Sequence, residues 1–224
     1  MDGMSCPHCA GIPRVFTSRV ARRELRTYWR HGPRLTTQWI LDALGGHGIT
    51  DRTLVDVGGG VGVLQHEFIR QGGAGVVGVD AAPDYLEICR AEATRRGYHE
   101  SAKYIGGDLV EKIEQVPYAD YVTLDRVPCC YPDPVALLGA AATRARRAVA
   151  MVWPRDRRLA RIGMGLGNFW MKATRNAFRA YVHSDAVVTD ALQARGFRRT
   201  LHRTTTMWQM ALFERGTGET VKAS

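Results

Sequence analysis

The chain has 224 residues, of which 45% are hydrophobic, and a formal net charge of +9. Its length and apolar content are those of a globular protein with a single α/β domain. No apolar run reaches the roughly 20 residues that span a bilayer, and the N-terminus does not read as a secretory signal. We therefore expect a cytoplasmic protein without a membrane span.

The positive charge is unevenly distributed. Residues 140–205 carry fourteen basic and three acidic residues, whereas residues 51–139 carry eight basic and fourteen acidic residues. The basic segment fits a solvated surface, and it also fits a surface that attracts an anionic substrate. The side chains concerned are Arg144, Arg146, Arg147, Arg155, Arg157, Arg158, Arg161, Lys172, Arg175 and Arg179.

Two helices are expected in the first 50 residues. Apolar residues at helical spacing predict the first over residues 14–30, and Gly32-Pro33 ends it. The second runs from about residue 36 to Gly45-Gly46. We interpret residues 1–50 as a helical lid segment. Its Cys6-x-x-Cys9 matches one half of a zinc site, to which His8 could add a ligand. Because no second pair follows, incidental thiols are favoured and we assign no metal site, although metal binding by this segment stays open.

A strand, a glycine loop and a second strand come next. Residues 53–57 and 75–80 predict the strands, and residues 62–71 predict the helix between them. The loop reads Asp-x-Gly-x-Gly-x-Gly from Asp56 to Gly62. A dinucleotide fingerprint would need glycine at position 63 or 65, and no Gly-Lys-Ser/Thr follows for a P-loop. The pattern therefore indicates a different kind of nucleoside site.

This pattern resembles motif I of the class I S-adenosylmethionine-dependent methyltransferases. In that family the first acidic residue lies near the methionine moiety and the second, here Asp80, binds the ribose. Residues 104–108 resemble the turn whose acidic residue faces the adenine amine, and residues 121–126 resemble the fourth strand, whose terminal acidic residue lies beside the methyl-transfer centre. The resemblance implies S-adenosyl-L-methionine as cofactor, bound by Asp56, Gly58, Gly60, Gly62, Asp80, Ala81, Asp108, Leu109 and Asp125.

The rest of the chain alternates strands and helices. We expect a Rossmann-like α/β fold with a seven-stranded, mostly parallel sheet, a C-terminal antiparallel hairpin and N-terminal helices. The methyltransferase domain would cover residues 51–214, followed by a frayed tail over 215–224. Within it, residues 154–183 form an insertion that predicts either an extra helix on the core or part of the lid. The other expected strands are 103–105, 119–125, 147–152, 197–203 and 205–214, and the other helices are 84–96, 134–146 and 185–195.

A small molecule is the expected acceptor. Residues 125–133 and 153–156 faintly resemble magnesium-protoporphyrin O-methyltransferases, which implies O-methylation of a carboxylate. A carboxylate is already nucleophilic, so catalysis would rest on desolvation and alignment. A phenol or an amine would instead need a general base, for which Asp125, Tyr131 and His183 are the candidates.

Two alternatives and the oligomeric state stay open. Cys129 follows Pro128 near the fourth strand, as does the nucleophilic cysteine of RNA 5-methylcytosine methyltransferases. The run is one residue longer than their Asp-x-Pro-Cys arrangement, and the chain shows no RNA-binding module, so nucleic acid is not the expected partner. The second alternative is a scaffold of the same fold that binds a nucleoside without turnover.

Overall fold

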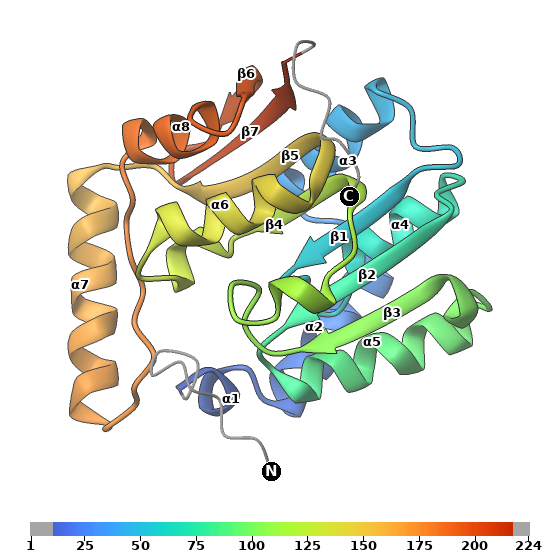
Figure 1. Cartoon of the computed structure of the whole chain (residues 1–224). Coiled ribbons are helices and arrows are strands. Elements are labelled where there is room, and N and C mark those ends of the chain that lie inside the picture. Colours follow the sequence, from blue (N-terminus) through green and yellow to red (C-terminus); the bar gives the residue numbers. More distant parts are fainter. Residues whose placement is uncertain (1–10, 217–224) are drawn as a thin grey trace.

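The computed structural model describes residues 11–216 and leaves residues 1–10 and 217–224 undescribed. The cysteine pair at Cys6 and Cys9 lies outside the described residues. Within the described range one seven-stranded sheet runs through the molecule in the order β3-β2-β1-β4-β5-β7-β6 (Figure 1).

The sheet has the expected mixture of strand directions. β1, β2, β3, β4 and β5 are parallel, and β7 joins β5 and β6 by antiparallel pairing. This confirms the predicted fold class. The strands are β1 (Thr53–Val57), β2 (Gly75–Asp80), β3 (Ala102–Gly106), β4 (Ala119–Asp125), β5 (Ala145–Pro154), β6 (Phe197–Thr204) and β7 (Trp208–Arg215).

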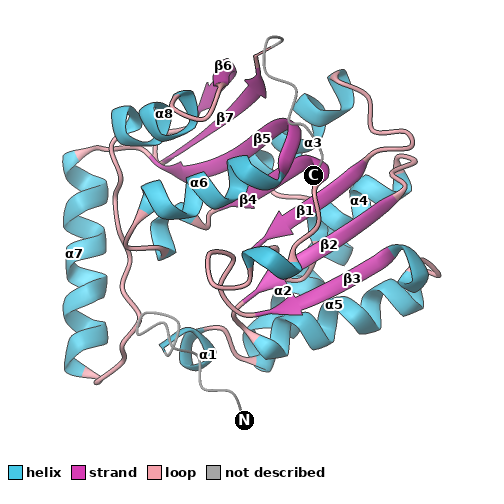
Figure 2. Ribbon diagram, viewed as in Figure 1, coloured by secondary structure: helices cyan, strands magenta, loops and turns pink. Residues whose placement is uncertain are grey.

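Helices cover both faces of the sheet (Figure 2). Leu54 packs with residues of α3 and α4 on one face, whereas Val55 packs with residues of α6 and α8 on the other. Because successive side chains of a strand point to opposite faces, a strand covered on both sides is apolar throughout. The helices of these layers are α3 (Leu35–Gly46), α4 (Val63–Arg70), α5 (Pro83–Arg95), α6 (Pro134–Arg144) and α8 (Asp185–Gln193).

The predicted first helix is in fact two helices. α1 (Ile12–Val15) ends before Phe16, and α2 (Ser18–His31) then begins. The backbone N–H of Ser18 donates to the carboxylate of Asp84 at 2.7 Å, so a residue of α5 caps the start of α2. The break was missed because this capping group is distant in sequence.

Two boundaries near the C-terminus also differ from the prediction. Residues 205–207 form the hairpin turn instead of the start of a strand, because the backbone N–H of Trp208 donates to Thr205 Oγ1 at 2.9 Å. At the other end, β7 includes Arg215, which was predicted to begin the frayed tail. The guanidinium of Arg215 donates to the carbonyls of Ala142 and Ala145 at 3.0 and 2.8 Å, which holds it in the fold.

The insertion over 154–183 contains α7 (Arg158–Ala173), which stands at the edge of the molecule (Figure 1). Of its described side chains only that of Ala160 is buried. α7 is therefore not an extra helix packed on the core. No helix in the described part of the chain is long and apolar enough to cross a membrane.

Replacing Phe213 with alanine tests the packing of the hairpin on the core. Phe213 is fully buried in β7, so Phe213→Ala should lower the free energy of unfolding by about 3–5 kcal/mol. Met207, in the turn of the same hairpin, is 59% exposed, and Met207→Ala should change it by less than about 0.5 kcal/mol. Urea denaturation measures both values, and similar losses in the two variants would contradict this packing.

Candidate active site

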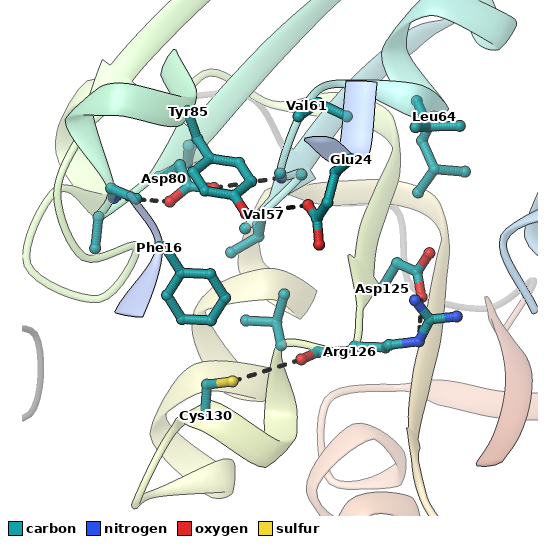
Figure 3. Close-up of a pocket in the computed structure, with 18 of the residues that line it drawn as sticks. Phe16, Glu24, Val57, Val61, Leu64, Asp80, Tyr85, Asp125, Arg126 and Cys130 are labelled. Carbon is teal, nitrogen blue, oxygen red and sulfur yellow. Dashed lines mark hydrogen bonds and ion pairs between the residues drawn. The ribbon is translucent and has the colours of Figure 1, made fainter. Parts of the chain in front are cut away.

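A cavity of about 290 Å³ opens where β1, β2 and β4 end, and residues of α1 and α2 also line it (Figure 3). Ligands of open α/β sheets bind at this end of the strands. Three predicted site residues, Asp56, Gly62 and His183, do not line the cavity. The predicted residues that do line it are Gly58, Gly60, Asp80, Ala81, Asp108, Leu109, Asp125 and Tyr131.

The glycine loop between β1 and α4 has the backbone that its sequence requires. Gly58, Gly60 and Gly62 have φ angles of 57°, 58° and 78°, a region that side chains disfavour. The N–H of Gly58 donates to the carbonyl of Val79 at 2.7 Å, which ties the loop to β2. Gly62 adopts this conformation at the start of α4, so it shapes the loop from outside the cavity.

Asp56 supports the loop from below. Its carboxylate is fully buried and accepts hydrogen bonds from Thr123 Oγ1 at 2.7 Å and Gln65 Nε2 at 3.0 Å. Burial raises the pKa of Asp56 to about 7. A Cβ atom on Gly59 would lie 2.1 Å from Asp56 Oδ2. Sequence reasoning left Gly59 out of the site, although the run of three consecutive glycines, of which Gly59 is the middle one, was the signal for this close approach.

Asp80 ends β2 and lines the cavity. One carboxylate oxygen accepts from the N–H of Ala82 at 2.8 Å, and the other accepts from the N–H of Gly60 at 3.4 Å. Burial raises the pKa of Asp80 to about 6, although these hydrogen bonds oppose the shift. Each oxygen keeps a lone pair, so the carboxylate can accept two further hydrogen bonds, as a ribose diol requires.

Asp108 and Tyr131 form one polar group. The hydroxyl of Tyr131 donates to Asp108 Oδ1 at 3.1 Å, and the N–H of Val110 donates to the same oxygen at 2.7 Å. Both side chains line the cavity. Tyr131, predicted as a candidate base, thus lies against the residue expected to face an adenine.

Asp125 and Arg126 lie together on another side of the cavity from Asp80 (Figure 3). Thr37 donates to Asp125 Oδ2, whereas Asp125 Oδ1 is buried and has no hydrogen-bond partner among the described residues. Arg126 Nε, 3.9 Å from Asp125 Oδ1, is likewise buried without a hydrogen bond in the described range. Buried polar atoms are normally hydrogen-bonded, and these two atoms, which form an ion pair with each other, are exceptions.

Arg126 is held in a costly conformation. Its φ angle is 64°, in a region that few residues other than glycine adopt. Its Nη2 donates to Thr36 Oγ1 at 2.6 Å, and its guanidinium lies 5.1 Å from the centre of the Trp208 ring. Burial lowers the pKa of Arg126, yet a guanidinium stays charged. The surrounding contacts therefore fix a cation at the cavity.

His183 and Cys129 are occupied elsewhere. His183 Nε2 lies 2.9 Å from the carbonyls of both Pro128 and Tyr131, so it carries the proton that it shares between them. Cys129 is buried, donates to the carbonyl of Arg126 at 3.1 Å and does not line the cavity. Its hydrogen bond with Cys130 and its burial raise the pKa of the Cys129 thiol, which disfavours the thiolate. The geometry does not favour either side chain as a catalytic group of this cavity.

Residues of the N-terminal helices form one wall of the cavity. The sequence analysis had named this segment as a lid but had not identified which of its residues would line the site. Glu24 of α2 accepts a hydrogen bond from Tyr85 of α5 at 3.0 Å, and both line the cavity. Phe16 lies edge-on to Tyr85, with ring centres 5.9 Å apart. Glu24 is the one carboxylate of α2, which carries five arginines. This isolated acidic residue was the feature of the sequence that could have marked Glu24 as a site residue.

The cavity matches a cationic nucleoside. Four carboxylate side chains line it, and S-adenosylmethionine carries a sulfonium and an ammonium group. Opposite charges at close range in a low-dielectric site attract strongly. The residues present therefore fit this cofactor. The carboxylates are those of Glu24, Asp80, Asp108 and Asp125.

The cavity's arginines are not those singled out by the charge pattern. None of the basic residues named between 144 and 179 lines it. Arg144 and Arg146, for example, lie over the ring of Tyr118. The cations that do line the cavity are Arg34 and Arg126, which belong to less basic parts of the sequence.

Cofactor affinity should depend on the ionisation of Asp80. A ribose hydroxyl donates to a carboxylate, so binding favours the ionised form, and affinity should fall as the pH falls through about 6. Calorimetric titration with S-adenosylmethionine should show about tenfold weaker binding near pH 5 than near pH 8. Asp80→Asn should bind weakly with a flat profile in this range, and an unchanged pH dependence in this variant would exclude Asp80 as the cause.

Gly59→Ala should damage the loop through Asp56. The new methyl group would displace a buried hydrogen-bonded carboxylate, so we expect a loss of about 1–3 kcal/mol in stability together with weaker cofactor binding. Gly46→Ala is the matched control, because a Cβ there meets nothing within 4 Å. Thermal unfolding and calorimetry check both variants, and equal behaviour would contradict the support role of Asp56.

Comparison with known proteins agrees with the geometry. Residues 55–147 match the family described as "Methyltransferase domain". Over 113 residues the chain is 33% identical to the ubiquinone biosynthesis O-methyltransferase of Serratia proteamaculans (strain 568), a match that covers 48% of this chain and 43% of that protein. The chain thus aligns with less than half of that relative's length.

Solved structures share the fold. The magnesium protoporphyrin IX methyltransferase of Synechocystis PCC 6803, with bound SAH, superposes with a TM-score of 0.64 at 18% identity, over 91% of this chain and 85% of that one. The geranyl diphosphate C-methyltransferase of Streptomyces coelicolor A3(2) has a TM-score of 0.64 at 13% identity, over 80% and 76%. The chain therefore has the fold of these methyltransferases, and residues 55–147 are similar to a methyltransferase domain.

Proposed function

We propose that this chain transfers a methyl group from S-adenosylmethionine to an oxygen atom of a small acceptor that is anionic or aromatic. The observation that carries the proposal is Arg126, a cation fixed at the cavity whose Nε–H has no hydrogen bond among the described residues, with the carboxylate of Asp125 3.9 Å away. An acceptor carboxylate would satisfy this donor. A charge-assisted hydrogen bond of this kind is stronger than a neutral one.

The cofactor would be held at the Asp80 side of the cavity. Asp80 would accept hydrogen bonds from the two ribose hydroxyls, and Asp108, which Tyr131 holds in place, would accept one from the adenine amine. Gly58 and Gly60 leave room for the cofactor against the loop. When bound, S-adenosylmethionine supplies an electrophilic methyl group on a sulfonium.

The acceptor would be held at the Asp125 side. Arg126 would bind its carboxylate, and the apolar side chains of Ile12, Phe16 and Val127 would exclude water from the reaction. An ionised carboxylate needs no general base, so the chain's contribution would be alignment, which can supply about 7–11 kcal/mol. Arg34 is the second cation that lines the cavity, although Glu24 lies 3.6 Å from it.

A phenolic acceptor would need a base, and Asp125 is the best placed. Its Oδ1 atom is buried and has no hydrogen bond in the described range, so it can accept a proton. Tyr131 already donates to Asp108, and His183 Nε2 faces two carbonyls. We therefore assign the proton-accepting role to Asp125 and positioning roles to the other two.

Of the lid expected over residues 1–50, the described part, residues 11–50, would cover both ligands. The support is that Phe16, Glu24 and Thr37, from α1–α3 and the segment between them, line the same cavity as the glycine loop. Names of similar proteins also favour a small acceptor, since magnesium protoporphyrin IX and geranyl diphosphate are small molecules. The Serratia relative is named as an O-methyltransferase.

Arg126→Gln should separate acceptor binding from cofactor binding. With a methyl-labelled cofactor and a panel of aromatic carboxylates, catechols and prenyl diphosphates, we expect a carboxylate to be methylated. Loss of the charged hydrogen bond, about 1.5–3 kcal/mol, should raise its KM by about 10- to 150-fold. The affinity for S-adenosylmethionine should change by less than about twofold. Arg146→Gln, at an exposed arginine outside the cavity, is the matched control.

Two outcomes would contradict this assignment. Cofactor binding without transfer to any acceptor would favour a scaffold that binds a nucleoside without turnover. Transfer with an unchanged KM in Arg126→Gln would remove Arg126 from the acceptor site.

A further inference from the structure

α7 exposes a row of large apolar side chains. Ile162, Leu166, Phe169 and Trp170 are 59%, 68%, 71% and 69% exposed. At 3.6 residues per turn, their spacing places all four on one side of the helix. We call these four residues the α7 apolar stripe. Exposed apolar residues gathered in this way mark an interaction surface.

The opposite side of α7 attaches the helix to the rest of the chain. Ala160 is buried there, and Asn168 exchanges two hydrogen bonds of 2.7 Å with the backbone of Ala180. Figure 1 shows the segment after α7 running back alongside the helix. Helical spacing places Ala160 and Asn168 on the side opposite Ile162 and Leu166. The α7 apolar stripe therefore points away from the described part of the molecule.

Cations lie along one side of the α7 apolar stripe. Residues 154–183 contain seven basic residues and one acidic residue, Asp156, which pairs with Arg161 at 2.6 Å. Arg158 and Lys172 are exposed on α7 itself. On a helical projection Arg158, Arg161 and Lys172 lie along one flank of the stripe. The surface is thus apolar along its centre and positive at its side.

Neither the cavity nor a membrane span explains this surface. No residue of α7 lines the cavity, and α7 is not long and apolar enough to cross a bilayer. Self-association would bring two clusters of arginines together, which like-charge repulsion opposes. The cations and the α7 apolar stripe together instead complement a partner with negative groups at its surface and an apolar interior.

We propose that α7 binds the interface of an anionic lipid bilayer. The apolar stripe would enter the boundary between headgroups and acyl chains, and Arg158, Arg161 and Lys172 would lie among the lipid phosphates. Phe and Trp suit this depth because they bring large apolar rings, and the indole N–H can reach water. Basic residues next to such a helix favour anionic over zwitterionic lipids. The inference is independent of the acceptor and of the proposed reaction.

Vesicle sedimentation tests the apolar stripe. The full chain should sediment with phosphatidylglycerol vesicles and bind phosphatidylcholine vesicles much less. Phe169→Ser combined with Trp170→Ser should weaken the binding by about tenfold or more. Tyr118→Ser is the matched control, because Tyr118 is 42% exposed and lies just before the start of β4, whereas α7 follows the end of the parallel strand β5. It should bind as the unaltered protein does. Circular dichroism and cofactor titration establish that each variant is folded.

A second pair of variants tests the charge. Arg158→Glu with Lys172→Glu should weaken binding to phosphatidylglycerol vesicles, and added salt should weaken the unaltered protein in the same way. Arg22→Glu, at an exposed arginine of α2, should have little effect. Brominated lipids should quench the fluorescence of the unaltered protein, and Trp170→Phe should remove that quenching.

Three results would overturn the proposal. The first is equal binding, or no binding, to anionic and zwitterionic vesicles. The second is full binding by the Phe169/Trp170 variant. The third is a dimer, seen by analytical ultracentrifugation without vesicle binding, that the same variant abolishes, since the stripe would then be an interface between two copies of the chain.

Discussion

The buried carboxylate of Asp56 has no solvent around it, and the glycine loop is built over it. Thr123 of β4 and Gln65 of α4 supply the hydrogen bonds that burial of this carboxylate demands. The loop passes so close that Gly59 cannot carry a Cβ atom. Two adjacent strands and a helix are thereby joined at one point. The position of the loop, and hence of Gly58 and Gly60 at the cavity, depends on this contact.

The cavity divides into parts of different character. Asp80, Asp108 and Tyr131 offer oxygen atoms suited to hydroxyl and amine groups, whereas Arg126 offers a positive charge held by Thr36 and Trp208. Asp125 lies beside Arg126, with one oxygen that has no hydrogen bond among the described residues. A cationic cofactor and an anionic acceptor would each find the opposite charge. Their mutual attraction would add to the alignment that these side chains impose.

Most of the basic residues of the chain lie away from the cavity in which the reaction is proposed to occur. Arginines dense in the sequence lie on surfaces outside the cavity, over the ring of Tyr118 or around α7. The arginine that matters for the proposed reaction stands in the acidic part of the chain. A segment rich in charged residues indicates a solvent-exposed surface, because many like charges can lie close together in sequence where water screens them. The position of a buried binding residue such as Arg126 instead depends on the particular residues that it contacts.

Local pattern determined most of the fold and the Asp80 side of the site. The β-branched runs, the loop from Asp56 to Gly62 and the order of the carboxylates predicted the parallel strands and the cavity at their ends. These features depend on residues that are close in sequence, so they can be predicted from the sequence alone. The tertiary structure alone decided the capping of α2 by Asp84, the burial of Asp56 and the placement of Glu24 and Arg126 at the cavity. It also decided that α7 turns its apolar residues outward. Each of these depends on contacts between residues distant in sequence, which periodicity and spacing do not encode.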